Sequence, residues 1–400
     1  MKGLFKKLGS IDAGMLCIPA LMLLGYIFIH ALFGGTLLSH NYWDSYSLQA
    51  MSWLSGRLDM GRNYEWLELA VYNGRYYLSF PPLPTVVMLP LVLLFGEQTP
   101  SNLVSALYGI STAMIACKIL KKAGMKQGGA VFFAIAYVWG SNMLWMSTSG
   151  GVWFLAQGLN MLLLTACVYF TQQKRRAAAY AMAALAVGCR PFSACMFLPL
   201  MAYFYMIDKG RSRAERIRGQ IRPLIIPALI AVCYMLYNYV RFGDVLEFGH
   251  NYLPEFMESE KGQFSLSYIL PNLYNLLLRP VTLKADLTLE YPLFNGFMFY
   301  IANPMFLIWF AAAAKDVCGK KLDAARLCIV IAMIAELMLL CAHKTLGGWQ
   351  FGARYTVDML PMALMYLLLK KDEPGGSSAF IMAAGMMFNL YGALAMTMLH

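Results

Sequence analysis

The stretch Tyr72–Gly96, YNGRYYLSFPPLPTVVMLPLVLLFG, decides the fold, because it determines on which side of a membrane every later loop lies. Its last 18 residues carry no charge and approach the length of about 20 apolar residues that spans a bilayer. Four of them are prolines, which restrict a regular helix to about Pro84–Gly96. A helix of that length reaches only about 20 Å, too short to cross a hydrocarbon core of about 30 Å. We therefore predict a juxtamembrane or re-entrant helix.

The composition predicts an integral membrane protein. Of the 400 residues, 60% are hydrophobic and 13% are charged, whereas about half apolar is usual for a soluble domain. Uncharged runs long enough to span a bilayer recur along the chain. We expect an all-α polytopic protein with about 11 transmembrane helices, in which residues 1–400 form a single transmembrane domain. The expected spans are 14–38, 101–120, 128–147, 152–172, 177–189, 191–207, 222–241, 296–314, 325–342, 355–369 and 376–399. The pair within 177–207 is also compatible with one long kinked helix.

The distribution of charge predicts the orientation. If the opening stretch does not cross, 22 of the 32 Lys and Arg lie on the side of the N-terminus, and if it crosses, most of them move to the other side. Basic residues accumulate on the cytoplasmic side of membrane proteins, which favours the first topology. We expect a multi-pass protein of the plasma membrane with a cytoplasmic N-terminus. The net charge of +11 then reflects basic residues at the surface of the lipid bilayer, and we expect no binding of nucleic acid. The outer loops 39–100, 241–295 and 343–354 would form an extracytoplasmic active-site face.

An acid follows the first predicted span closely. Asp44 lies in HNYWDSYSLQ, about six residues beyond the hydrophobic end. It is a candidate general base or metal ligand held near the membrane surface. The alternative is an ordinary surface acid within an interfacial belt of aromatic residues. Glu65 and Glu68, on a short amphipathic helix expected over 64–72, are candidate partners, and His40 is a weaker one. Asp44 and Glu68 together are a candidate site for a divalent metal ion.

Basic residues on the expected outer side form a second group of candidates. Arginines are rare there, and a planar guanidinium group suits phosphate oxygens, so a shared anionic ligand would account for them. The alternative is contact with lipid headgroups. The candidates are Arg190, Arg241, Arg279 and Arg354. A further ionisable residue, Glu336, lies midway along a predicted span, where we expect a protonated carboxyl that hydrogen-bonds to a neighbouring helix.

Five segments taken together resemble the GT-C glycosyltransferases, a superfamily of bacterial lipid-linked sugar transferases and protein O-mannosyltransferases. They are NYWDSYSLQAMSWLSGRLDMG, YNGRYYLSFPPLPTVVMLP, GCRPFSACMFLPL, YNYVRFGDVLEFGHNYL and GGWQFGARYTVDMLP, and they occur in the order typical of that superfamily. The resemblance implies an outward-facing site that uses a polyprenyl-phosphate-linked sugar, with Asp44 as the catalytic base and Pro81–Pro82 lining the site. In the same segments, His250, Trp349 and Tyr355 join the candidate substrate-binding residues.

The chain departs from the family pattern at two positions. Ser45 follows Asp44 where many members have a second acid, and Phe80 stands where a lysine commonly precedes the two prolines. These differences leave metal dependence open and leave an arginine (Arg190, Arg241 or Arg354) to bind the lipid phosphate.

The expected activity is transfer of a hexose or pentose to a glycan, lipid or protein acceptor. A single base on the attacking side implies inversion, and the activated donor requires no nucleotide-binding loop. One alternative is a transporter or flippase for a lipid-linked or anionic solute, although no internal repeat typical of transporters is visible. The other is a scaffold without chemistry.

Overall fold

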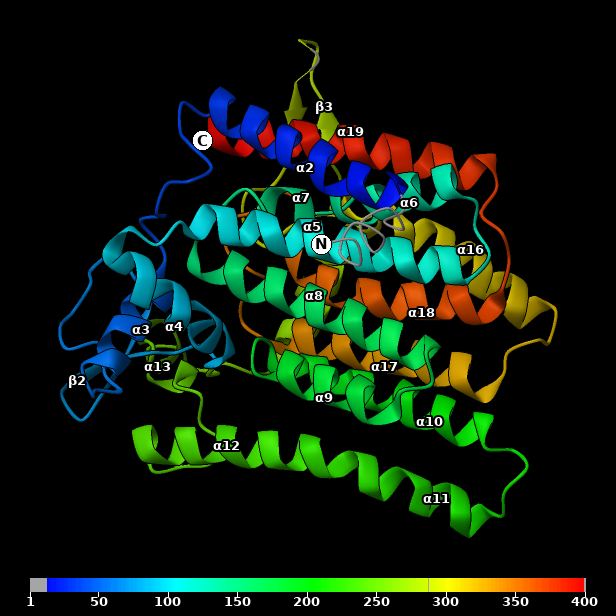
Figure 1. The fold of residues 1–400 in the computed structure, drawn as a ribbon. Coiled ribbons are helices and arrows are strands. Elements are labelled where there is room, and N and C mark those ends of the chain that lie inside the picture. Colours follow the sequence, from blue (N-terminus) through cyan, green and yellow to red (C-terminus); the bar gives the residue numbers. More distant parts are fainter. Residues whose placement is uncertain (1–12, 287, 399–400) are drawn as a thin grey trace, which may run out of the picture.

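The computed structural model describes residues 13–286 and 288–398, which form a bundle of long helices with short elements gathered at one end (Figure 1). The helices of the bundle are α2 (Ala13–Leu32), α5 (Ser101–Lys122), α6 (Gln127–Trp139), α8 (Val152–Gln172), α9 (Arg176–Val187), α10 (Phe197–Ile207), α11 (Arg213–Ile221), α12 (Ile225–Phe242), α16 (Met305–Cys318), α17 (Ala324–Ala342), α18 (Leu360–Lys370) and α19 (Gly376–Met398). Among the described residues, six helices are long and apolar enough to cross a membrane. The chain is therefore a multi-pass membrane protein, and the count of about 11 crossings stays a prediction.

Shorter elements connect the long helices. The short helices are α3 (Ser45–Leu54), α4 (Leu83–Phe95), α7 (Met143–Met146), α13 (Pro254–Met257), α14 (Ile269–Leu277) and α15 (Phe299–Ala302). The strands are β1 (Leu69–Tyr72), β2 (Arg75–Leu78), β3 (Thr282–Leu283) and β4 (Leu289–Glu290). The 3₁₀ helices are η1 (Gly96–Gln98), η2 (Pro191–Met196), η3 (Arg222–Leu224), η4 (His250–Tyr252), η5 (Leu266–Tyr268) and η6 (Arg354–Met359). Figure 1 places α3, α4, α13 and β2 together at the left end of the bundle, which we call the loop end.

Helix α4 has the length that the prolines predict. It spans 13 residues, and Pro82 caps its start with a backbone that is already helical. The backbone N–H of Leu83 donates to the carbonyl of Gly188 at 3.0 Å, which attaches the helix to the junction between α9 and η2. The helix lies with α3 and β2 at the loop end (Figure 1), as expected for a segment too short to cross.

The helix predicted over residues 64–72 is wrong. These residues lead into an antiparallel hairpin in which β1 pairs with β2 and Leu69 lies opposite Leu78. Asn73 and Gly74 connect the strands with φ angles of +49° and +70°. This conformation belongs to the two-residue turn for which Asn-Gly is strongly preferred. The apolar pattern alone fits a helix or a strand, and the turn residues decide in favour of the strand.

The segment 177–207 forms two helices rather than one. Helix α9 ends at Val187, and the chain resumes as η2 followed by α10, which packs against α9. Gly188 lies at the break, where a Cβ atom would come within 2.0 Å of the hydroxyl oxygen of Tyr234 on α12. The absence of a side chain at this position therefore permits the close approach of α12.

Buried asparagines hold the loop after α6 against three later segments. The backbone N–H of Asn142 donates to Oδ1 of Asn303 at 2.8 Å, and its Nδ2 donates to Oδ1 of Asn389 at 3.1 Å. Its Oδ1 accepts from the N–H of Ala353 at 2.9 Å, and Nδ2 of Asn303 donates to Oγ1 of Thr356 at 3.0 Å. These bonds fix the start of η6 relative to α7, α15 and α19.

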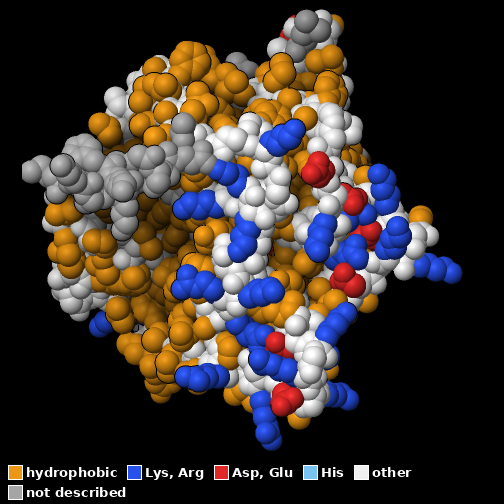
Figure 2. All heavy atoms as spheres, turned by 45° about the vertical axis from the view of Figure 1, so that its right-hand side comes forward, with side chains coloured by type: hydrophobic (Ala, Val, Ile, Leu, Met, Phe, Trp, Pro, Cys, Tyr) orange, Lys and Arg blue, Asp and Glu red, His pale blue; other side chains and the backbone are white. Residues whose placement is uncertain are grey.

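The end of the bundle opposite the loop end is basic. Figure 2, which turns the right-hand side of Figure 1 forward, shows Lys and Arg side chains gathered on this face. Asp316 is buried there and accepts hydrogen bonds from Arg326 and Lys370, each at 2.6 Å. This acid joins α16, α17 and α18.

Candidate active site

Asp44 lies at the loop end and caps helix α3. Its carboxylate accepts hydrogen bonds from the backbone N–H of Ser47 at 3.0 Å and from the Ser47 hydroxyl at 2.6 Å. An acidic residue at this position satisfies a free N–H group and interacts favourably with the helix dipole. The preceding turn is fixed because the carbonyl of Trp43 accepts from the N–H of Val152 at the start of α8. The position of the carboxylate is therefore set by two helices.

The environment of Asp44 favours a proton acceptor. The side chain is fully buried, and burial raises the pKa of its carboxyl, while hydrogen bonds from Ser47, the charge of His40 and a contact with Ser101 oppose the shift. Nδ1 of His40 lies 3.9 Å from the carboxylate. A carboxylate with a raised pKa is a stronger base than an exposed aspartate, which suits general base catalysis.

Arg190 lies at the junction between α9 and η2 and pairs with a buried acid. Its Nε donates to Oδ2 of Asp358 at 2.8 Å, and the other oxygen of Asp358 accepts from Nδ2 of Asn160 at 2.9 Å. The guanidinium group stacks on the ring of Tyr355 at 4.2 Å from the ring centroid. The pair fixes the plane of the guanidinium group, and Asp358 occupies only its Nε side.

Arg354 is buried without a carboxylate partner within salt-bridge distance among the described residues. Its Nε donates to the carbonyl of Gly347 at 2.9 Å, and its Nη1 donates to Oε1 of Gln157 at 2.7 Å. The guanidinium group lies 4.8 Å from the ring centroids of both Trp153 and Tyr355. Burial lowers its pKa to about 10, so it remains a cation at neutral pH. The ring of Tyr355 thus contacts both arginines. Of the two, only Arg190 forms an ion pair with a carboxylate among the described residues, which favours an anionic ligand for Arg354.

Arg241 and Arg279 do not join this pair through any contact of the described residues. Arg241, at the end of α12, donates to the carbonyls of Leu78 at 2.8 Å and Phe248 at 3.4 Å, and it thereby holds β2 against the following loop. Arg279 is half-buried and donates to Oδ1 of Asn275 at 3.3 Å. The contacts of Arg241 and Arg279 connect neighbouring segments of the chain and do not form a binding site shared with Arg190 and Arg354.

Glu68 interacts electrostatically with Arg354, and no contact between described residues joins it to Asp44. Glu68 is exposed, and its Oε2 accepts from Nε1 of Trp153 at 3.2 Å. A groove of about 430 Å³ runs along this acid and Glu255. No group of three or more His, Cys, Asp and Glu in the described part of the chain could hold a metal ion, and both oxygens of Asp44 already accept from Ser47. The donor set therefore does not fit a divalent ion, and we assign no step to one.

The remaining candidates surround the arginine pair at different depths. The ring of His250 packs against Phe80 at 5.3 Å between ring centroids, and burial, with the nearby His343, lowers its pKa to about 3. His250 is therefore neutral at physiological pH. Trp349 lies edge-on to Trp145 at 5.8 Å and bridges to the backbone of Phe294. It supports the loop before Arg354 rather than facing Asp44.

Glu336 does not have the hydrogen bond that we expected. It is buried within α17, and neither of its carboxylate oxygens has a hydrogen-bond partner among residues 13–286 and 288–398. It does interact electrostatically with Arg190 and Asp358. The sequence does not reveal this arrangement because the three residues are far apart along the chain.

No protein-family description matches the sequence, and no curated protein sequence matches it. Solved structures do match the fold. The structure of ArnT from Cupriavidus metallidurans bound to undecaprenyl phosphate aligns with a TM-score of 0.56 at 15% identity, over 94% of this chain and 63% of ArnT. The apo oligosaccharyltransferase of Archaeoglobus fulgidus aligns with a TM-score of 0.50 at 13% identity, over 96% of this chain and 56% of that protein. The chain has the GT-C fold.

This GT-C fold is shorter than those of the matched proteins, because the chain spans less than two thirds of the length of each. At these identities the likeness concerns the fold alone. The site residues of the present chain therefore rest on its own geometry.

The predicted site residues do not include two residues that organise the candidate site. Asp358 pairs with Arg190, and Trp153 connects Glu68 to Arg354. A signal existed for Asp358, because it is a lone acid within the apolar run 355–369. Trp153 gave no signal, since tryptophan at the start of a span is also typical of the membrane interface.

Proposed function

We propose that the chain is a membrane glycosyltransferase that moves a hexose or pentose from a polyprenyl-phosphate-linked donor to an extracytoplasmic glycan, lipid or protein acceptor. The observation that carries the proposal is the buried carboxylate of Asp44 at the loop end of a GT-C fold. The pair of Arg190 and Arg354 around Tyr355 supports an anionic donor. The undecaprenyl phosphate bound to ArnT supports a lipid of this class.

In the proposed reaction, Asp44 accepts the proton of an acceptor hydroxyl group while that oxygen attacks the anomeric carbon of the donor. The bond between this carbon and the phosphate oxygen breaks, and the electron pair leaves with the polyprenyl phosphate. Arg190 and Arg354 would stabilise the negative charge that develops on the phosphate. Attack from the side opposite the phosphate inverts the configuration at the anomeric carbon.

We further propose that the loop end faces away from the cytoplasm, with the N-terminus on the cytoplasmic side of the plasma membrane. The Lys and Arg side chains gathered at the opposite end support this orientation (Figure 2). A lipid-linked donor would then reach the site within the outer leaflet, and its phosphate would lie near the membrane surface.

The test is Asp44→Asn in protein reconstituted into liposomes with polyprenyl-phosphate hexoses and pentoses and an extract of cell-envelope glycans and lipids. Because asparagine also caps helices, we expect the variant to keep the stability of α3. Release of bare polyprenyl phosphate should fall by about 10²–10⁴, the usual contribution of a general base. The control is Asp59→Asn, because Asp59 lies in the same loop and its carboxylate accepts from the backbone of Gly61. Transfer by Asp44→Asn at the wild-type rate would remove Asp44 from the mechanism.

The alternative is transport of a lipid-linked or anionic solute, and the partnerless carboxyl of Glu336 favours it. Loss of activity in Glu336→Gln, with wild-type behaviour of Asp44→Asn, would make transport the better explanation. Wild-type behaviour of both variants would instead favour a scaffold without chemistry.

A further inference from the structure

Several hydroxyl groups at or near the loop end are buried and have no hydrogen-bond partner in the described part of the chain. The residues that carry them are Ser45, Tyr46, Ser79 and Tyr108. A buried polar group without a partner is costly, so proteins almost always provide one, and exceptions call for a missing water or ligand. Two of these residues, Ser45 and Tyr46, directly follow Asp44 in the sequence, and their buried hydroxyl groups suggest a ligand that carries hydrogen-bonding groups.

Both tyrosines interact electrostatically with the carboxylate of Asp44. Tyr46 stands two residues further along α3 and interacts electrostatically with both Asp44 and Arg190. Tyr108 stands on α5, about two turns beyond Ser101, the residue that opens this helix beside Asp44. It also interacts electrostatically with Asp44.

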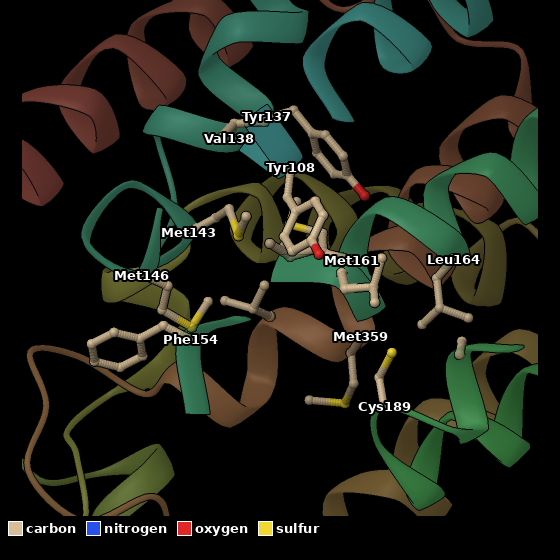
Figure 3. Packing of buried hydrophobic residues seen from close by; sticks show 14 of the residues in the cluster. Tyr108, Tyr137, Val138, Met143, Met146, Phe154, Met161, Leu164, Cys189 and Met359 are labelled. Carbon is tan, nitrogen blue, oxygen red and sulfur yellow. The ribbon is translucent and has the colours of Figure 1, made fainter. Parts of the chain in front are cut away.

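Among the described residues, the hydroxyl group of Tyr108 has no hydrogen-bond partner. Figure 3 shows this group pointing toward Met161, among apolar side chains, with Cys189 on the same side of the ring. Thioether and thiol sulfurs are weak acceptors. Tyr137, in the same view, differs because its hydroxyl group bonds to Oγ1 of Thr165 at 3.2 Å.

The reaction geometry specifies what must lie between a base and a phosphate-binding cation. The anomeric carbon lies between the attacking oxygen, which the base contacts, and the leaving phosphate, which the cation contacts. Groups placed between Asp44 and Arg190 therefore meet the sugar ring. Tyr46 interacts with both residues, and burial raises the pKa of its phenol, so that it remains a hydrogen-bond donor.

We infer that Tyr46 and Tyr108 bind the sugar of the donor, by donating hydrogen bonds from their buried hydroxyl groups to sugar hydroxyl oxygens. The inference rests on the proposed function and adds specificity-determining residues to it. A sugar that lacks the hydroxyl group contacted by one of these tyrosines would leave that phenol without a partner, and the site would discriminate against such a sugar.

The experiment compares Tyr46→Phe and Tyr108→Phe with the matched control Tyr137→Phe. Binding is measured by tryptophan fluorescence for polyprenyl phosphate bearing glucose, mannose or arabinose, and for the bare polyprenyl phosphate. We expect the first two variants to weaken binding of the best sugar-bearing lipid about tenfold each and to leave binding of the bare lipid unchanged. Their melting temperatures should equal or exceed that of the wild type, because no protein hydrogen bond is lost. Tyr137→Phe should show the reverse pattern, with a lower melting temperature and unchanged sugar preference.

Wild-type binding of sugar-bearing lipids by both Tyr46→Phe and Tyr108→Phe would overturn the inference. So would a wild-type protein that binds the sugar-bearing lipids no more tightly than the bare lipid. The proposed function is tested separately by transfer, because a protein that transfers no sugar can still show the binding difference. Equal weakening for the bare lipid would mean that the tyrosines hold a water or the phosphate, and it would also overturn the assignment to the sugar.

Discussion

Removal of the Asp358 carboxylate should be among the most destabilising single changes in the chain. The carboxylate is fully buried and accepts from Arg190 at 2.8 Å and from Asn160 at 2.9 Å. Asp358→Ala leaves the largely buried cation of Arg190, whose side chain is 18% exposed, and the buried amide of Asn160 without this partner. Breaking a buried ion pair from one side costs about 3–5 kcal/mol. We therefore expect a loss of about 3–5 kcal/mol in the free energy of unfolding.

The assay is reversible unfolding by SDS in mixed micelles, followed by tryptophan fluorescence. The double variant Arg190→Met with Asp358→Ala should recover part of the loss, because it removes the uncompensated charge as well. The control is Glu290→Ala, since Glu290 and Lys284 are exposed and 3.9 Å apart, and such pairs contribute at most about 1 kcal/mol. Equal stabilities of Asp358→Ala and the double variant would refute the claim that the unpaired charge causes the loss.

Three further predictions concern other parts of the chain. Burial raises the pKa of Asp44, so the rate of transfer by the wild type should decrease with decreasing pH with a midpoint above the ordinary aspartate pKa of 3.8. A midpoint at or below 3.8 would contradict a buried carboxylate. Gly392→Ala should destabilise α19 by about 1–3 kcal/mol, because the new Cβ would lie 2.1 Å from the ring of Phe351, whereas Gly128→Ala, with open space, should not. Burial lowers the pKa of His343 to about 4 in the folded protein. Below pH 6.5 the unfolded chain therefore binds more protons than the folded protein, and the free energy of unfolding decreases as the pH is lowered from 6.5 to 4. His343→Gln should reduce that fall by up to about 3 kcal/mol, and an unchanged pH profile would contradict the assignment.

The sequence allowed accurate prediction wherever one local rule dominates. Prolines set the length of α4, and the long apolar runs matched α5, α8 and α17 closely. The turn residues Asn73 and Gly74 predict a hairpin, whereas the amphipathic pattern of the preceding segment predicts a helix. The wrong prediction of a helix came from a choice between two local signals rather than from missing information.

Contacts between distant residues could not be predicted from one sequence. Four arginines were equal candidates, and their sequence contexts do not show that Arg190 and Arg354 share Tyr355 while Arg241 binds backbone carbonyls. The pairing of Arg190 with Asp358 spans 168 residues. Such pairings depend on how the helices pack, and no periodicity within a single helix determines that packing.

The asparagine cluster around Asn142 has a consequence for biosynthesis. Its partners come from residues 303, 353 and 389, so the amide is fully satisfied only after α19 has left the ribosome and inserted. Until then, polar amides face either lipid or a chaperone within the membrane. A chain that stops before α19 would keep this defect permanently, and quality-control proteases that inspect the bilayer would have a clear signal to remove it.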